Sequence, residues 1–291
     1  MDADDASQNI EVIHPAKAAG ESAEVTSGPE GATSPMSVTH RVVKLLDLVG
    51  RMDGGVGARE AERITGIDRS AVSRIFRQLE GFGWVEQVDN RGTYRVGPAM
   101  FAVAAAVRQR DSLWQAAAPL LQALTDRFDE TTYLAVRRGD QVVFVEKVDC
   151  SQPIRYFVEL NQPFPLTTGA AGRSILTAIP RKEAAAVVAS GLVAYTPASI
   201  TEPEKYLDQL DEDRDLGYVY SQSGWVTRGA GVAAAFFEAS GGCAGAITLS
   251  APLDRLTPDA VLTIGPAVRA VAHQLSHRLG YTGEHPDELA E

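Results

Sequence analysis

The sequence lacks several features that would place it in common protein classes. Only two of its 291 residues are cysteines, Cys150 and Cys243. Two cysteines are too few for a disulfide framework or for a zinc site built from cysteine alone. We therefore expect two unpaired thiols, with a single bridge between them as the alternative. No apolar run reaches the roughly 20 residues that cross a bilayer, and no signal-peptide pattern opens the chain. These absences predict a cytoplasmic protein with no membrane partner.

Metal and catalytic patterns are also scarce. His273 and His277 have the i, i+4 spacing of a metal pair, but no third ligand is near them in the sequence, so a solvated helix face is the favoured interpretation. Residues 169–174, Gly-Ala-Ala-Gly-Arg-Ser, have the wrong spacing for a phosphate-binding loop and carry arginine in place of lysine. No combination of nucleophile, base and acid stands out. We expect no catalytic residue, no metal and no cofactor.

The net charge of −11 is distributed unevenly along the chain. Residues 1–37 carry seven acids against one lysine, whereas residues 38–98 carry ten Arg and Lys against eight Asp and Glu. Only this second segment is basic, which favours local, specific contact with nucleic acid over general coating of it.

Composition and periodicity divide the chain into five segments. Residues 1–37 are rich in Gly, Ser, Ala, Pro and acids without periodicity, which predicts a disordered tail. A first domain is expected over residues 38–98, an alanine-rich linker helix over 99–112, a second domain over 113–281, and a flexible tail over 282–291. The linker helix could also form the dimer interface, or it could lie buried within one subunit.

The first domain is organised around residues 58–95. Val72, Ile75, Phe76 and Leu79 have the spacing of one buried helical stripe. A shorter amphipathic segment precedes them, and the turn between the two contains glycine, which is the helix-turn-helix signature. Asp68 is expected to cap the second helix. Two short helices around a glycine turn also occur in ordinary helical bundles.

The opposite face of the second helix carries hydroxyls and guanidinium groups, which suit phosphate oxygens and the acceptor edge of guanine. Residues 84–88 and 93–96 then predict a hairpin, which gives the order of a winged helix-turn-helix. The turn of this wing would meet the DNA backbone or a minor groove, although a hairpin that simply covers the helices is the alternative. The candidate DNA-binding residues are Arg69, Ser70, Ser73, Arg74, Arg77, Asn90 and Arg91.

The second domain has mixed patterns of helix and strand. Helices that bracket a largely antiparallel sheet predict an α+β sensor-like domain. Helices are expected over residues 113–128, 168–179, 181–190, 202–216 and 258–279, and strands over 132–137, 141–148, 154–160, 218–221, 232–237 and 246–250.

Seven segments follow one another in an order that characterises a known family: residues 67–74, 79–85, 94–98, 129–132, 165–174, 195–197 and 215–218. Through these segments, the chain from Val38 to Gly280 resembles the IclR family (isocitrate lyase regulators) of bacterial transcription factors. The resemblance implies a winged helix-turn-helix, a linker helix, a GAF-like α/β effector-binding domain, and dimers that often pair into tetramers.

The resemblance also implies a pocket in the second domain. The family presents a helix N-terminus there, whose free N–H groups and dipole favour a carboxylate; a glycine-rich turn that packs against the sheet is the alternative. Aromatic residues could line the pocket, although aromatics in strands more often belong to the core. The candidate effector-binding residues are Thr167, Thr168, Gly169, Ala170, Ala171, Tyr133, Phe144, Trp225, Gly231, Ala233 and Ser250.

Residues 223–229 depart from the family pattern, because Gly224 and Arg228 stand where many members have an acid followed by glycine. The identity of the effector therefore cannot be inferred from other members of the family. The leading hypothesis is a DNA-binding transcriptional regulator, with repression favoured by family frequency. Its affinity for double-stranded operator DNA would respond to a carboxylate or aromatic small molecule, and it would be a homodimer or a dimer of dimers. The alternatives are an enzyme with an accessory helical domain and a DNA-bound scaffold that answers to a protein partner.

Overall fold

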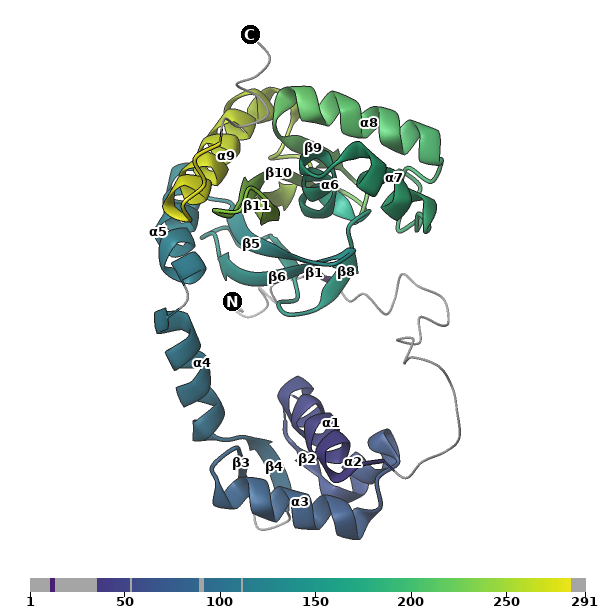
Figure 1. The fold of residues 1–291 in the computed structure, drawn as a ribbon, viewed down its shortest axis with the longest axis vertical. Coiled ribbons are helices and arrows are strands. Elements are labelled where there is room, and N and C mark those ends of the chain that lie inside the picture. Colours follow the sequence, from purple (N-terminus) through teal and green to yellow (C-terminus); the bar gives the residue numbers. More distant parts are fainter. Residues whose placement is uncertain (1–10, 14–35, 53, 89–91, 111, 284–291) are drawn as a thin grey trace, which may run out of the picture. The chain divides into compact units, whose positions relative to one another are not determined.

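Figure 1 shows the computed structural model, which describes residues 11–13, 36–52, 54–88, 92–110 and 112–283. These residues fall into two compact units, and the boundary lies between α4 and α5. The N-terminal unit holds α1 to α4, and the C-terminal unit holds all elements from α5 onward together with β1. Each unit is described separately below.

The N-terminal unit combines helices with a small sheet. Its elements are α1 (Val38–Arg51), β2 (Val56–Gly57), α2 (Ala58–Thr65), α3 (Arg69–Gly81), β3 (Val85–Gln87), β4 (Thr93–Val96) and α4 (Pro98–Arg110). The strands form an antiparallel sheet in the order β2-β4-β3. The two-residue strand β2 was not expected from the sequence, because two residues are too few to show a period.

The predicted helix-turn-helix forms around one core. Val72 and Phe76 of α3 are fully buried beside Leu45 of α1, and the Phe76 and Tyr94 ring centroids lie 4.8 Å apart. Leu79 is half-buried at the edge of this core. Gly66 ends α2 in a left-handed conformation with φ 70°, which glycine adopts without steric cost.

The C-terminal unit contains most of the strands and the longest helix described. Its elements are β1 (Glu11–Ile13), α5 (Ser112–Phe128), β5 (Thr131–Arg138), β6 (Gln141–Val148), β7 (Tyr156–Val158), β8 (Pro163–Pro165), α6 (Gly169–Ala178), α7 (Arg181–Ala189), α8 (Pro203–Leu216), β9 (Val219–Gln222), β10 (Gly229–Phe237), β11 (Cys243–Pro252) and α9 (Pro258–Arg278). Six strands form an antiparallel sheet in the order β8-β6-β5-β11-β10-β9. The strand β1 pairs in parallel with β7.

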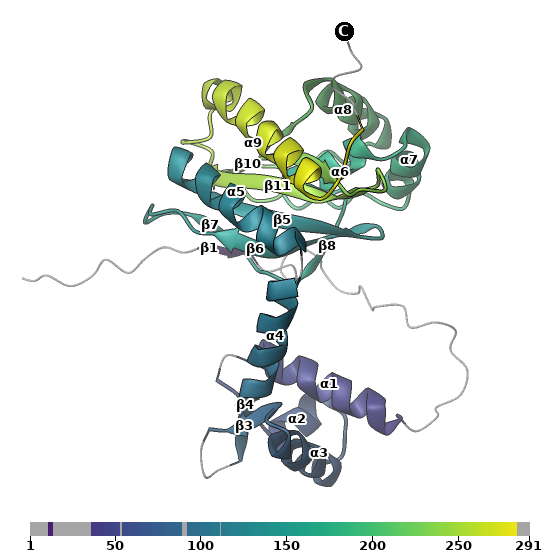
Figure 2. The ribbon, with the colours of Figure 1, turned by 60° about the vertical axis from the view of Figure 1, so that its left-hand side comes forward.

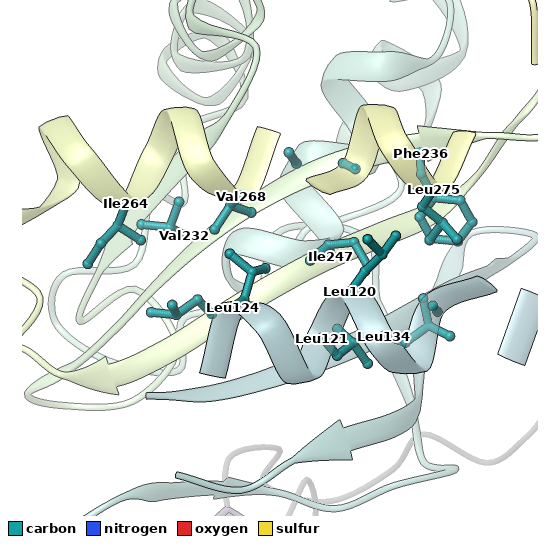
Figure 3. Close-up of a cluster of buried hydrophobic side chains, with 14 of the residues drawn as sticks. Leu120, Leu121, Leu124, Leu134, Val232, Phe236, Ile247, Ile264, Val268 and Leu275 are labelled. Carbon is teal, nitrogen blue, oxygen red and sulfur yellow. The ribbon is translucent and has the colours of Figure 1, made fainter. Parts of the chain in front are cut away.

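Helices cover both faces of this sheet (Figure 2). Alternate strand residues point to opposite faces, so Val232 and Ile247 pack against Leu120 of α5 and Val268 of α9 on one side (Figure 3). On the other side, Tyr133 and Ala135 pack with α6, α7 and α8. The resulting α/β layers confirm the predicted fold class.

The C-terminal unit differs from the sequence-based expectations in three places. The strand expected over residues 154–160 is only Tyr156–Val158, and β8 was not expected at all. Proline cannot donate to a strand ladder, but β8 is an edge strand, where two prolines are tolerated. Residues 11–13, within the segment expected to be disordered, form β1 because β7 offers them a strand to pair with.

Cys150 and Cys243 are both free thiols, which agrees with the expectation of no bridge between them. Cys150 is buried, and burial raises the pKa of Cys243 to about 12. The Cys243 thiol therefore does not have the depressed pKa of a redox-reactive cysteine. No helix in the part of the chain that the structure describes is long and apolar enough to cross a membrane.

Candidate functional sites

The exposed side of α3 carries the predicted DNA-contacting residues. Arg69, Ser70, Arg74 and Arg77 are exposed and Ser73 is half-buried, whereas Asn90 and Arg91 lie outside the described residues. The amphipathic pattern of α3 causes this arrangement, because its apolar stripe occupies the core. The helix therefore presents a continuous polar face to solvent.

Asp68 fixes the start of α3. Its carboxylate accepts hydrogen bonds from the backbone N–H of Ser70 at 2.9 Å and of Ala71 at 3.3 Å. The hydroxyl of Ser70 also donates to Asp68, and this bond together with the two backbone bonds lowers the pKa of Asp68. The predicted cap is therefore present. Ser70 takes part in it, so only the acceptor capacity of its hydroxyl remains for another partner.

The arginines of α3 differ in how they are held. Arg77 donates from Nε to the backbone oxygen of Ser73 at 3.3 Å. By contrast, the side chains of Arg69 and Arg74 have no hydrogen-bond or ion-pair partner among the described residues. Arg63 of α2 lies 3.7 Å from Glu60. Two unpaired guanidinium groups on one helical face can bind phosphate oxygens or guanine.

A pocket opens on the α6 side of the large sheet. It encloses about 50 Å³ between the start of α6, the loop before β10, and strands β5, β10 and β11. Phe144 and Trp225 form one wall of the pocket and stack with ring centroids 6.1 Å apart. Phe164, which does not line the pocket, meets Trp225 edge-on with ring centroids 4.9 Å apart. None of the lining side chains is charged.

The N-terminus of α6 forms the polar end of this pocket. Its N-cap residue, Thr168, makes no side-chain hydrogen bond to the helix, so the first N–H groups are left without a side-chain cap. Gly169 has φ 64°, and a Cβ there would lie 3.2 Å from the Trp225 ring. Ala170 and Ala171 follow it with small side chains. This geometry allows a ligand to approach the helix backbone directly.

Thr248 adds a polar group that the sequence analysis missed. It stands opposite Tyr133 of β5 and Ala233 of β10 in the strand register, so its side chain points to the α6 face. Its hydroxyl is buried and has no hydrogen-bond partner in the described part of the chain. The neighbouring polar groups do have partners, since Tyr133 donates to the Tyr156 carbonyl at 3.2 Å and Ser250 donates to the Ala230 carbonyl at 3.4 Å.

Most predicted effector-binding residues meet in this one pocket. Tyr133, Phe144, Thr168, Gly169, Ala170, Ala171, Trp225, Gly231 and Ser250 line it. Thr167 does not, because it faces a neighbouring cavity, and Ala233 packs against Ala170 and Val219 instead. Tyr156, Val158 and Thr248 line the pocket but were not predicted. Alternate residues of a strand point to the same face of the sheet, so Thr248, two residues before the predicted Ser250, could have been identified from the sequence.

Among the described residues no group of three His, Cys, Asp or Glu side chains could hold a metal ion. His277 instead places Nδ1 at 3.2 Å from the backbone oxygen of Tyr281.

A winged helix-turn-helix with exposed arginines, joined to a domain with an uncharged pocket, defines a DNA-binding regulator that carries a sensor domain. Comparisons with known proteins agree. Residues 38–89 match the model of the IclR helix-turn-helix domain, and residues 105–277 match that of the C-terminal domain of the bacterial transcriptional regulator IclR. The chain therefore belongs to the IclR family, a family of DNA-binding transcriptional regulators rather than enzymes, and the predicted resemblance is confirmed.

Individual relatives match most of the chain. The transcriptional regulator KipR of Bacillus subtilis is 30% identical over 77% of this chain and 89% of its own length. The transcriptional repressor AllR of Klebsiella pneumoniae is 27% identical over 82% of this chain and 89% of its own. An IclR regulator from Silicibacter sp. TM1040 is 26% identical, with a TM-score of 0.69 over 86% of this chain and 99% of its own.

A structure from Microbacterium hydrocarbonoxydans shows the same fold with a bound small molecule. This IclR homologue, in complex with 4-hydroxybenzoate, has a TM-score of 0.72, 22% identity, and covers 84% of this chain and 99% of its own.

Proposed function

We propose that this IclR-family regulator is a repressor whose binding to operator DNA is controlled by a small carboxylate in the α6 pocket. The observation that carries the proposal is the pairing of an uncapped helix N-terminus with the unpartnered Thr248 hydroxyl in one uncharged pocket. The helix N–H groups and dipole favour a carboxylate. Thr248 would bond a second oxygen of the same ligand. The AllR relatives are repressors, and such a protein acts at the chromosome, in the cytoplasm.

The size of the pocket limits this ligand. One water-sized site needs roughly 10–15 Å³, so a cavity of about 50 Å³ takes an acid of only a few heavy atoms. A benzoate is larger and would require Trp225, whose ring lies 3.2 Å from a Cβ built on Gly169, to shift. The 4-hydroxybenzoate complex of the Microbacterium relative motivates including aromatic acids as a second class.

A ligand-induced thermal shift tests the proposal. Short 2-oxo and 2-hydroxy acids, benzoate and 4-hydroxybenzoate are each compared with the corresponding neutral amide. A true effector stabilises the folded protein by an amount set by its excess over Kd. We expect an acid to raise the melting temperature, its amide not to, and Thr248→Val to weaken the effect roughly threefold to tenfold in Kd. Equal shifts from acid and amide would remove the carboxylate from the proposal.

We also infer that the protein works as a homodimer joined through α4. The described part of this helix is rich in alanine, and Phe101 and Val103 are exposed on it, 67% and 48% respectively. Exposed apolar side chains on a small-residue helix suit close packing against a second helix. A dimer would present two α3 helices to successive major grooves, so the operator would be a palindrome with half-sites about one helical turn apart.

A further inference from the structure

A second cavity lies beside the α6 pocket within the C-terminal unit. It encloses about 220 Å³ between α6, α8, β9 and the turn around Tyr195. Gly169, Ser221 and Gly224 line both cavities. The second cavity differs from the first in holding a charged side chain, Arg173. The proposed function does not account for this cavity.

The charge of Arg173 is already neutralised within the protein. Its Nε lies 2.7 Å from Oδ2 of Asp213, and its Nη2 donates to the Tyr220 carbonyl at 2.6 Å. Arg173 and Asp213 are 8% and 4% exposed, so neither charge is solvated by bulk water. The ion pair as a whole is neutral, so it offers an anionic ligand little net attraction, and an anion that displaced Asp213 would leave that carboxylate buried without its partner. The cavity therefore favours an uncharged ligand.

The second cavity contains a buried hydroxyl group, that of Tyr206, that can still form hydrogen bonds. This residue lines the cavity and is 4% exposed, and its hydroxyl has no hydrogen-bond partner among the described residues. Buried hydroxyl groups in native proteins nearly always bond to protein, water or ligand. The carboxamide of Gln209 lies on the same wall, and its nitrogen already donates to Glu212 and Asp213, which leaves its oxygen free to accept.

We propose that this cavity is a second ligand-binding site, which takes a neutral, hydroxyl-rich small molecule such as a monosaccharide or polyol. The Tyr206 hydroxyl and the Gln209 carbonyl oxygen bond hydroxyl groups of the ligand, while the Arg173–Asp213 pair stays intact. The apolar side chains of Ile200 and Ala198 contact its carbon skeleton.

The wall between the cavities links the second site to the first. Ser199 donates from its hydroxyl to the Gly224 carbonyl at 2.8 Å, and Thr196 donates to the Ser223 carbonyl. Trp225 follows directly and forms the aromatic wall of the α6 pocket. A ligand that contacts Ser199 shifts this loop, so occupancy of the second cavity changes affinity in the first, and the change is reciprocal.

Binding of defined neutral probes to the full-length protein tests the site. Glycerol, D-xylose, D-glucose and myo-inositol are titrated by calorimetry and by saturation-transfer NMR, with acetate and D-gluconate as anionic counterparts. We expect saturable binding of at least one neutral probe, with one site per chain. Tyr206→Phe removes only the hydroxyl and weakens this binding roughly threefold to tenfold. Ala198→Trp fills the exposed side of the cavity and abolishes it.

Tyr218→Phe is the matched control, because it also removes one tyrosine hydroxyl, but from a residue that packs on the α5 and α9 side of the sheet and lines neither cavity, so neutral-probe binding stays unchanged. The proposal is overturned if no neutral probe saturates at millimolar concentration, if binding survives both Tyr206→Phe and Ala198→Trp, or if only the anions depend on Tyr206. Failure of the carboxylate proposal appears separately, as the absence of a Thr248-dependent shift.

Discussion

At the scale of single residues, the DNA-binding face and the two cavities depend on groups that have no partner among the described residues. Arg69 and Arg74 are exposed and unpaired on α3, and Thr248 and Tyr206 are buried with unbonded hydroxyls among the described residues. Exposed arginines cost the folded protein little, whereas a buried orphan hydroxyl costs about 1–3 kcal/mol. The exposed guanidinium groups can therefore bind DNA, and the buried hydroxyl groups can bind a small-molecule ligand.

Replacing Arg74 with alanine tests the exposed group. If this guanidinium contacts a base, operator binding weakens by about 1–3 kcal/mol. Fluorescence anisotropy with a selected operator at several salt concentrations measures both affinity and salt slope. Arg63→Ala is the control, because Arg63 is also exposed but already lies beside Glu60. Unchanged affinity and salt slope in folded Arg74→Ala protein would remove Arg74 from the interface.

Asp213 gives the stability of the protein a pH dependence with a definite sign. Burial raises the pKa of Asp213 from its ordinary 3.8 to about 6, against the lowering effect of Arg173. The folded state therefore holds a proton that the unfolded state releases, and the contribution of Asp213 to stability falls as pH rises from about 4 to about 6.

Asp213→Asn removes this titration. The parent protein's stability minus the variant's should therefore decrease across that pH range, by at most about 3 kcal/mol. Urea unfolding of both proteins at pH 4.5, 5.5 and 7 measures the difference. A difference that grows with pH would mean that attraction to Arg173 outweighs burial.

At the scale of secondary-structure elements, local sequence signals decide how much could be predicted. The helix α3 was predictable because its apolar stripe, glycine turn and Asp68 cap all lie within a few residues of one another. The strand β8 was not, because its two prolines argue against a strand and only its edge position permits one. The local sequence pattern does not show whether a segment will form an edge strand of a sheet.

The candidate pocket also combines features that the sequence predicts with features that only the folded structure shows. The helix N-terminus at Gly169 was predicted through family resemblance, and Phe144 and Trp225 were predicted as aromatic lining residues, whereas Thr248 was missed. The second cavity was not predicted at all, since Arg173, Ser199 and Tyr206 come from different elements that meet only in the folded domain. Cavities depend on the packing of whole elements, which the order of residues alone does not give.

Loss of the α3 cap should weaken DNA binding indirectly. Asp68→Ala removes three hydrogen bonds that hold the first turn, so both the melting temperature and the operator affinity should fall. Asp68→Asn, which can still cap, should retain most of both. Circular dichroism melting and anisotropy follow the two properties. If Asp68→Ala reduced affinity without any change in melting, Asp68 would act at the DNA and not through the helix.

At the scale of the whole molecule, regulation requires that the C-terminal domain influence how the two helix-turn-helix domains of a dimer bind DNA. The proposed dimer through α4 supplies this connection, because α4 directly precedes the C-terminal unit in the chain. An effector can switch the protein only by binding one arrangement of the dimer more tightly than another.

Phe101→Glu tests the dimer. A charge on an apolar helix contact is costly to bury, so sedimentation should show dissociation at concentrations where the parent protein is dimeric. Leu262→Glu, another exposed apolar position but on α9, should leave the mass unchanged. A parent protein that sediments as a monomer, or a Phe101→Glu dimer as stable as the parent, would contradict the α4 interface.

The most direct test of the account is selection of genomic DNA fragments by the purified protein at near-physiological salt, followed by footprinting with and without the acid that raises its melting temperature. We predict a short palindromic footprint that disappears when the acid is added and remains with its neutral amide. Binding that is sensitive to salt but indifferent to sequence, or a footprint that no ligand alters, would contradict a ligand-controlled repressor.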